Sequence, residues 1–402
     1  MIAMRPNEMT LDYHDKPRHE VLHLESGMTE SPNEPVTLSV VIPCFNEART
    51  LRTCVDAVLA IADDDLRLDI VIVDDASTDD AGRIADDIAS ERSCVRVEHH
   101  AINRGKGAAL RTGFALASGD FVAVQDADLE YDPQDLKRLV EPLRQGRADV
   151  VMGSRYMTTH QHRVLMYWHT LGNRFLTWLS NMLTDMNLTD METCYKVFRR
   201  GVIQSIVLEE DRFGFEPEVV AKIADLRLRV YEMGISYHGR SYAEGKKIGV
   251  KDGFRALYCI LRYNGYRTSL PIQFAIYLMI GATAAVANLF IFLMILRFGW
   301  PPVVATSVSF AIAALLNYWL CTRILFRHRS RWNAAAEWGV YLAVVLIAGT
   351  IDTAVTLTIL SLIGSEPITA AAAKAMGTLA SLLVNFFGRR QFVFAGKRRE
   401  PW

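Results

Sequence analysis

The chain has 402 residues, which is more than one average domain. Its 44 Lys and Arg residues almost balance its 45 Asp and Glu residues, giving a formal net charge of −1. No general electrostatic attraction to nucleic acid is therefore expected. The six cysteines form no C-x-x-C pair, which indicates a reducing compartment rather than a metal or disulfide framework.

Residues 1–36 are polar and lack an apolar core, so we expect a flexible tail and not a signal peptide. Short apolar runs and helical patterns then alternate within a domain expected at 37–250. The runs are Thr37–Ile42, Leu68–Val73, Val95–Glu98, Phe121–Val124 and Val150–Met152, and the helical patterns lie at 47–62, 78–91, 105–117 and 133–145. Strands separated by helices predict an α/β fold with a mainly parallel sheet covered on both faces.

A polar cluster follows each predicted strand. The clusters are Pro43–Glu47, Asp74–Asp79, Asn103–Gly107, Asp126–Glu130 and Gly153–Arg155. Ligands of such sheets bind outside the carboxyl ends of the strands, so the clusters are expected to line one pocket. Taken singly, the second could be a helix cap and the third a turn. No G-x-G-x-x-G is complete, which disfavours a dinucleotide site.

The fourth cluster carries carboxylates at alternate positions, namely Asp126, Asp128 and Glu130. Carboxylates this close repel one another unless a cation lies between them. Hard oxygen ligands suit Mg²⁺ or Mn²⁺, which also take substrate phosphates as ligands. The pattern predicts a metal–diphosphate site, and a solvated acidic turn is the alternative.

Four motifs, in chain order, resemble the signature of family 2 glycosyltransferases, which have the GT-A fold. They are VIPCFNE at Val41–Glu47, VDDASTD at Val73–Asp79, NRGKG at Asn103–Gly107 and DAD at Asp126–Asp128. The dolichol-phosphate mannose synthase and polyprenyl-phosphate glycosyltransferase branch is the most similar. LTDMETCYKVF at Leu188–Phe198 resembles its acceptor-side motif, and 240–248 resembles its basic segment before the membrane. The Q-x-x-R-W motif of processive synthases is absent from the sequence, which favours transfer of a single sugar.

The resemblance implies roles for individual residues. The nucleotide-sugar donor would be held by Pro43, Asn46, Glu47, Asp74, Asp75, Lys106 and Asp126. Asp126, Asp128 and Glu130 would hold Mg²⁺ or Mn²⁺, although the third metal position in this branch is often an amide. Arg155, Arg174 and Lys247 would bind phosphates, including that of the lipid acceptor, and Arg174 could equally be a surface charge of a helix. Asp128, Asp126 and Arg155 are the expected catalytic set.

These roles predict an inverting transfer of one sugar from GDP-mannose or UDP-glucose to undecaprenyl or dolichyl phosphate. The metal would neutralise the departing diphosphate. The acceptor phosphate is largely ionised near neutral pH, since a phosphoryl pKa lies near ~6, so it needs no general base. Transfer to another kind of acceptor would need a general base, and neither Asp190 nor Glu192 is a decisive candidate for that role.

Four long runs with almost no charge follow from residue 271. They are Ile272–Leu296, Val303–Cys321, Trp338–Ile363 and Ile368–Phe387. Each is near the ~20 residues that span a bilayer, and none has the polar face of a soluble bundle helix. We therefore expect an all-α domain of four transmembrane helices at 271–395, followed by a basic tail at 396–402.

Lys and Arg gather before the first run, after the second run and in the tail, whereas the other two loops offer only Arg297. This bias places both ends of the chain and the soluble domain on the cytoplasmic side of the inner membrane. Residues 251–270 predict an amphipathic helix with Phe254 and Ile260 on its apolar face, suited to the membrane interface. A packed connector helix is the alternative.

The membrane part contains an internal repeat. Asn317-Tyr318-Trp319 and Asn385-Phe386-Phe387 end the second and fourth runs alike, and Tyr277 and Asn288 match Tyr341 and Asp352 in spacing. This short unit resembles GtrA-type membrane proteins, which are associated with lipid-linked sugar traffic. Asp352 and Lys374 could form a structural salt bridge or a lipid-headgroup site.

Two other functions stay open. The membrane part could flip lipid-linked sugar while the soluble part loads it, or the enzyme could act on another lipid acceptor. The expected partners are a nucleotide-diphosphate sugar, a polyprenyl phosphate and the membrane, without nucleic acid. A homo-oligomer is also open.

Overall fold

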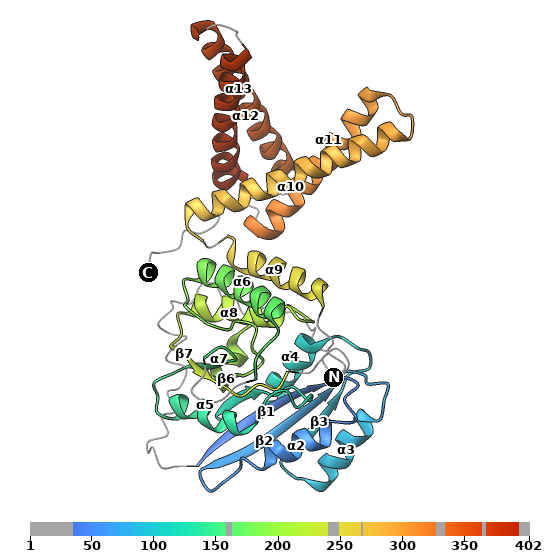
Figure 1. Cartoon of the computed structure of the whole chain (residues 1–402), viewed down its shortest axis with the longest axis vertical. Helices are drawn as coiled ribbons and strands as arrows, with labels where there is room; N and C mark the ends of the chain where they lie inside the picture. The colour runs from blue at the N-terminus through green and yellow to red at the C-terminus, as the bar shows by residue number, and fades with distance from the viewer. Residues whose placement is uncertain are drawn as a thin grey trace, which may run out of the picture. The chain divides into compact units, whose positions relative to one another are not determined.

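A computed structural model describes residues 35–157, 163–239, 249–266, 268–326, 334–363 and 367–393. The chain divides into two compact units (Figure 1). The first consists of Met1–Arg174, Leu188–Val219 and Asp225–Ile248, and the second of Phe175–Asn187, Val220–Ala224 and Gly249–Trp402. The second unit thus combines the apolar C-terminal half with two short pieces from the middle of the chain.

The first unit is built on a seven-stranded sheet in the order β3-β2-β1-β4-β6-β5-β7. The strands are β1 (Val36–Cys44), β2 (Leu66–Asp74), β3 (Val95–His99), β4 (Phe121–Val124), β5 (Val150–Ser154), β6 (Lys196–Arg199) and β7 (Val230–Gly234). Only β6 runs antiparallel to its neighbours, β4 and β5. All other pairs are parallel, so the predicted mainly parallel α/β fold is confirmed.

All five predicted strands are present, but β6 and β7 were not predicted as strands. The β6 sequence KVFR is only four residues long and begins and ends with a charged residue, which hides the strand pattern. Lys196 is nevertheless fully buried, and its Nζ donates hydrogen bonds to the carbonyl oxygens of Met191 and Thr193. A buried lysine satisfied by local carbonyls gives no signal in the sequence.

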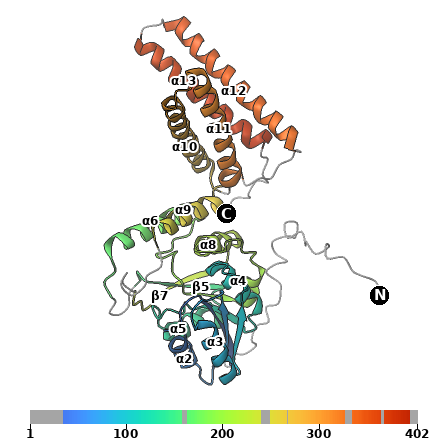
Figure 2. The ribbon, with the colours of Figure 1, turned by 90° about the vertical axis from the view of Figure 1, so that its right-hand side faces the viewer.

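Helices flank the sheet (Figures 1 and 2). The predicted helical patterns contain α2 (Leu51–Leu59), α3 (Ala81–Glu91), α4 (Lys106–Leu116) and α5 (Gln134–Arg144), and the unpredicted ones are α6 (Tyr167–Thr184), α7 (Arg200–Ser205) and α8 (Phe215–Leu226). Helix α4 lies very close to β1, since a Cβ on Gly113 would come within 2.2 Å of Val41 Cγ1. This close packing fixes the start of α4 beside the carboxyl end of the sheet.

The second unit contains the predicted four apolar helices. They are α10 (Leu270–Arg297), α11 (Pro302–Leu320), α12 (Ala334–Ile363) and α13 (Pro367–Gly388). Helices α10 and α11 form one hairpin, and α12 and α13 form another (Figure 1). Within the described residues, Leu270–Arg297 is the one helix long and apolar enough to cross a membrane by length and composition, while Ala311–Leu325 and Ala336–Ile351 are shorter apolar stretches.

The two hairpins also end alike. Helix α11 passes into the π-helix η2 (Cys321–Leu325), and α13 passes into the π-helix η3 (Arg389–Val393). Each π-helix begins four residues after the asparagine that marks the sequence repeat, Asn317 or Asn385. Since π-helical turns are rare and often functional, this shared ending marks the ends of α11 and α13 for closer study.

Helix α9 (Val250–Asn264) occupies the predicted amphipathic segment. Its start is capped by Asp252, whose carboxylate accepts a hydrogen bond from the Gly249 amide at 2.8 Å. The predicted apolar face is divided, because Ile260 is fully buried while Phe254 is 69% exposed. Cys259 and Tyr263 pack with Ala221 in a small core of the second unit. The predicted role of α9 at the membrane interface would therefore rest on its exposed residues, and it stays a prediction.

Candidate active site

Parallel pairing brings the predicted polar clusters to one edge of the sheet. Cys44 at the end of β1 pairs with Asp74 at the end of β2, and Asp74 pairs with His99 at the end of β3. Strand β4 is parallel to β1, and β5 runs in the same direction as β4 because β6 is antiparallel to both. The carboxyl ends of all five predicted strands therefore share one edge.

The loops after β1 and β2 are joined by side chain to backbone hydrogen bonds. Asn46, with a φ of 55°, accepts a hydrogen bond at its amide oxygen from the Thr78 backbone at 2.7 Å, and its own backbone donates to Ser77 Oγ at 3.0 Å. Asp79 accepts a hydrogen bond from the Ala48 amide at 3.0 Å. The predicted donor-site residue Asn46 thus holds two loops together, with Pro43 and Glu47 partly exposed beside it.

Asp75 organises the loop after β3. Its carboxylate accepts backbone hydrogen bonds from Arg104 at 2.9 Å and Gly105 at 2.6 Å, and it lies 2.7 Å from His100 Nδ1. The neighbouring carboxylate of Asp74 accepts the Ser77 amide at 3.1 Å. Both aspartates are buried, so they shape the loops at this edge of the sheet through these bonds rather than through free carboxylates.

Gly105 and Gly107 allow the start of α4 to lie against the segment 210–212. A Cβ on Gly105 would come within 2.4 Å of the Asp211 carbonyl oxygen, and one on Gly107 within 2.2 Å of the Glu210 carbonyl oxygen. Gly105 also has a φ of 100° and a ψ of 164°, a region used almost only by glycine. The NRGKG motif is therefore a close backbone approach and more than a turn.

Replacing Gly105 with alanine should destabilise the first unit by about 1–3 kcal/mol from backbone strain alone, with the clash added. Thermal unfolding of the full-length protein in detergent would show it as a lower Tm. Gly172→Ala is the matched control, since a Cβ there meets nothing within 4 Å and the residue lies inside α6. An alanine in a helix interior should be neutral or slightly stabilising. Equal Tm values for the two variants would contradict the close-approach role.

Lys106 and Asp126 are the centre of the site. Lys106 Nζ lies 2.9 Å from Asp126 Oδ1 and 3.2 Å from Glu216 Oε1. Burial disfavours the charged lysine, but the attraction of Asp126 and Glu216 outweighs it and holds the Lys106 pKa well above its usual value. Glu216, at the start of α8, was not expected from the sequence, because it lies far along the chain from both partners.

The three predicted metal-ligating carboxylates are placed differently. Asp126 and Asp128 are partly exposed at the end of β4, whereas Glu130 is buried and accepts a hydrogen bond from the Tyr237 hydroxyl at 2.7 Å. The described residues contain no group of three His, Cys, Asp or Glu side chains arranged to hold a metal ion. Two carboxylates with hard oxygen donors still suit Mg²⁺ or Mn²⁺ that completes its shell with water and diphosphate.

Arg155 is held by Asp190 from the predicted acceptor-side motif. Arg155 Nε and Nη2 donate to Asp190 at 2.7 and 2.8 Å, and the Arg155 amide donates to the same carboxylate at 3.0 Å. Asp190 is fully buried. Burial lowers the pKa of Arg155, but the attraction of Asp190 outweighs this and keeps its pKa well above the usual value.

Arg155 and Arg174 meet at one aromatic ring. The guanidinium carbons lie 5.9 Å and 5.7 Å from the centre of the Tyr156 ring, respectively. Arg174 projects from α6 and is exposed, so it is both a surface charge and a neighbour of Arg155. The third predicted phosphate ligand, Lys247, lies outside the described residues. Tyr156 was not expected from the sequence.

Glu192 is a partly buried acid whose Oε1 atom is buried without a hydrogen-bond partner within the described structure. Burial raises its pKa to about 8, and the nearby Glu216 carboxylate contributes to the rise. A folded-state pKa above the unfolded value of about 4.3 means that the folded protein keeps a proton that the unfolded chain loses. The stability of the first unit should therefore fall as the pH rises from about 4 to about 8.

Glu192→Gln should raise the Tm more at about pH 8 than at about pH 5, because glutamine resembles the protonated acid and removes the cost of keeping it neutral. The gain is expected to reach a few kcal/mol, at roughly 1.4 kcal/mol per unit of pKa. Differential scanning fluorimetry at both pH values would measure it. Exposed Glu98→Gln is the control and should shift the Tm equally at both pH values. An equal shift of the Tm at both pH values in Glu192→Gln would show that Glu192 is not held protonated in the folded protein.

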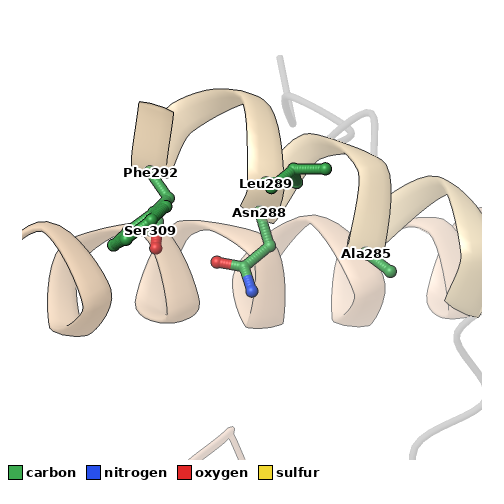
Figure 3. A pocket seen from close by; sticks show the side chains of 5 residues that line it. All are labelled: Ala285, Asn288, Leu289, Phe292 and Ser309. Carbon is green, nitrogen blue, oxygen red and sulfur yellow. The ribbon is translucent and has the colours of Figure 1, made fainter. Parts of the chain in front are cut away.

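The membrane hairpin α10–α11 contains a small hollow of about 270 Å³, lined by Ala285, Asn288, Leu289, Phe292 and Ser309 (Figure 3). The Asn288 side chain extends toward α11, and its Oδ1 is buried without a hydrogen-bond partner in the described structure. Asp352 and Lys374 lie on α12 and α13, but their side chains are outside the described part of the chain. The proposed pair stays a prediction.

Comparison with known proteins assigns both halves of the chain. Residues 39–207 match the family model "Glycosyl transferase family 2", and residues 276–394 match "GtrA/DPMS, transmembrane domain". A solved structure of glucosyl-3-phosphoglycerate synthase from Mycobacterium tuberculosis, with Mn²⁺, uridine-diphosphate and glucosyl-3-phosphoglycerate, superimposes with a TM-score of 0.46. It has 20% sequence identity, and the alignment covers 66% of this chain and 87% of that one.

Curated relatives are similar over the first half. A low-salt glycan biosynthesis hexosyltransferase of Haloferax volcanii is 29% identical, over 58% of this chain and 56% of that protein. An undecaprenyl-phosphate mannosyltransferase of Micrococcus luteus is 30% identical, over 52% of this chain and 86% of that protein. A dodecaprenyl-phosphate galacturonate synthase of Rhizobium johnstonii is 27% identical, over 58% and 68%. The chain therefore belongs to the family 2 glycosyltransferases, as an enzyme that also carries a GtrA/DPMS-type transmembrane domain.

Proposed function

We propose that this enzyme transfers one sugar from a nucleotide-diphosphate sugar, such as GDP-mannose or UDP-glucose, to a polyprenyl phosphate at the cytoplasmic face of the inner membrane. The observation that carries the proposal is the acidic end of β4, where Asp126 and Asp128 are partly exposed and Lys106 Nζ lies 2.9 Å from Asp126 Oδ1. The relatives from Micrococcus luteus and Rhizobium johnstonii, an undecaprenyl-phosphate mannosyltransferase and a dodecaprenyl-phosphate galacturonate synthase, support the acceptor class.

The donor would lie over the loops after β1 and β2, with its diphosphate at Asp126 and Asp128. The loop contacts of Asn46, Asp74 and Asp75 hold these segments rigid, which positions a ligand at low entropic cost. Asp126 and Asp128 would hold Mg²⁺ or Mn²⁺, which when bound neutralises charge on the leaving diphosphate. Glu130 is the weaker candidate ligand, because its carboxylate is already engaged by Tyr237.

The acceptor phosphate would be bound by Arg155 and Arg174, with Lys247 as the third predicted cation. Asp190 fixes the Arg155 guanidinium by two hydrogen bonds, so this arginine is oriented before the substrate arrives. The exposed Arg174 can then add charge at the same aromatic ring. An ionised phosphate oxygen attacks the anomeric carbon, the bond to the diphosphate breaks, and the configuration inverts.

The basic residues that precede α10 and those that follow α11 and α13 support a topology with both chain ends in the cytoplasm. The formal net charge of −1 gives the chain no general attraction to nucleic acid, so the proposed partners are the two substrates and the membrane. A homo-oligomer also stays open.

The decisive experiment uses detergent-purified full-length protein, a panel of radiolabelled nucleotide sugars and undecaprenyl phosphate, with Mg²⁺, Mn²⁺ or EDTA. A lipid-linked product from one donor that disappears with EDTA is the expected result, and it names the sugar. Protein that binds nucleotide but forms no lipid product from any donor would overturn the proposed acceptor. Another lipid acceptor, or transport of a lipid-linked sugar, would then become the better account.

A further inference from the structure

Arg389 is a buried cation at the start of η3, with 6% of its surface exposed. Its Nη1 donates a hydrogen bond to Asn317 Oδ1 at 2.7 Å and lies 3.9 Å from Cys321 Sγ. Its guanidinium carbon lies 4.6 Å from the centre of the Tyr341 ring and 5.7 Å from that of Tyr277. One side chain from the end of α13 thus contacts α10, α12 and the end of α11.

The charge of Arg389 has no carboxylate partner among the described residues. Its neighbours are an amide, a thiol and two aromatic rings, and its Nε is buried with no hydrogen-bond partner in the part of the chain that the structure describes. A buried charge without a counter-ion is costly, and aromatic faces compensate for only part of that cost. Buried ionisable groups in a membrane domain are accordingly strong candidates for binding a ligand. The chemistry of the site calls for an anion.

The surroundings of Arg389 combine further positive charge with aromatic walls. Arg323 is exposed in η2 and Arg390 is partly exposed in η3, so a negatively charged group is favoured near these helix ends. The Tyr277 ring lies 5.5 Å from Phe386, leading from the cation into apolar residues. A cation next to an apolar wall suits a phosphate carried on a hydrocarbon chain, and the guanidinium fork matches phosphate oxygens.

We propose that Arg389, together with Asn317, forms a second phosphate-binding site, in the membrane domain, for the head group of an isoprenoid phosphate. The identity of the lipid rests on the proposed function, but the site does not use the residues assigned there to the acceptor. The Nε and the remaining guanidinium nitrogens donate to the phosphate while Asn317 keeps the guanidinium in place. Tyr277 and Tyr341 flank the head group and the first isoprene units.

The test is photolabelling of the full-length protein in nanodiscs with a diazirine-bearing undecaprenyl phosphate, followed by peptide mapping. Labelling of α10 and α12 peptides near Tyr277 and Tyr341 is expected with the phosphate, and about tenfold less with the matching undecaprenol. Arg389→Gln should reduce the phosphate-dependent labelling about tenfold, and Arg389→Lys should retain part of it. Arg297→Gln, which removes an exposed arginine at the C-terminal end of α10, should leave the labelling unchanged.

Equal labelling by the alcohol and the phosphate in the wild-type protein would overturn the proposal, and this comparison does not depend on the folding of any variant. Complete competition by inorganic phosphate would identify a free-phosphate site and overturn the lipid assignment. Labelling requires no sugar transfer, so the two proposals fail separately. An inactive donor panel with Arg389-dependent labelling would refute only the proposed reaction, whereas an active panel with unchanged labelling in Arg389→Gln would refute only this site.

Discussion

Asp128→Asn is expected to lower the rate of sugar transfer by about 10²–10³-fold, the cost typical of losing one electrostatic contact to charge that develops in the transition state. The substitution keeps the size of the side chain and its ability to accept the backbone hydrogen bond from Glu130, which spans 3.1 Å. What it removes is the negative charge that would hold the metal on the leaving diphosphate. The initial rate with the donor found in the panel measures the effect directly.

Metal binding gives a readout that does not depend on turnover. In the presence of nucleoside diphosphate, Asp128→Asn should bind Mn²⁺ more weakly than the wild type in a paramagnetic titration. Asp132→Asn is the matched control, because Asp132 is an exposed carboxylate whose Oδ1 accepts the Gln134 amide at 3.0 Å, a role that asparagine can fill. Near-normal transfer by the Asp128 variant would show that the metal assignment is wrong.

The sequence predicts those parts of this site that are local in the chain. The strands were visible as apolar runs, and the polar clusters followed them directly, because strand ends and loops are adjacent in sequence. The single-edge arrangement then required only that the strands run in parallel, which the registers confirm. The insertion of β6 between β4 and β5 could not be predicted, since nothing within KVFR encodes its antiparallel partners.

Contacts between distant residues were not predictable in the same way. Glu130 was expected to bind metal, yet its partner Tyr237 lies 107 residues further along the chain. Lys106 was expected at the donor, but its second partner Glu216 comes from a helix that was not predicted. In the membrane unit, the apolar runs of the sequence predicted four helices and their repeat. The contacts of Arg389 with the side chains of three other helices depend on how those helices pack. One sequence shows which residues are charged, but not which charges meet.

Arg155→Met is expected to destabilise the first unit by about 3–5 kcal/mol, because it leaves the Asp190 carboxylate buried without its counter-ion. For a unit of this size the Tm should fall by roughly 6–20 °C. The Arg155 side chain is only 11% exposed, so water cannot replace the lost contacts. Thermal unfolding of the full-length protein in detergent would measure the shift.

The double variant Arg155→Met with Asp190→Asn separates stability from function. It removes both charges together, so it should recover much of the lost Tm while sugar transfer stays low, because the proposed phosphate ligand is still missing. The control is Arg52→Met, which breaks an equally bidentate pair with Glu91 at 2.8 and 3.1 Å, but on the surface. Water screens that pair, so the Tm should barely change. Recovery of transfer along with the Tm would mean that Arg155 only neutralises Asp190, and the acceptor phosphate would then have to be bound without it.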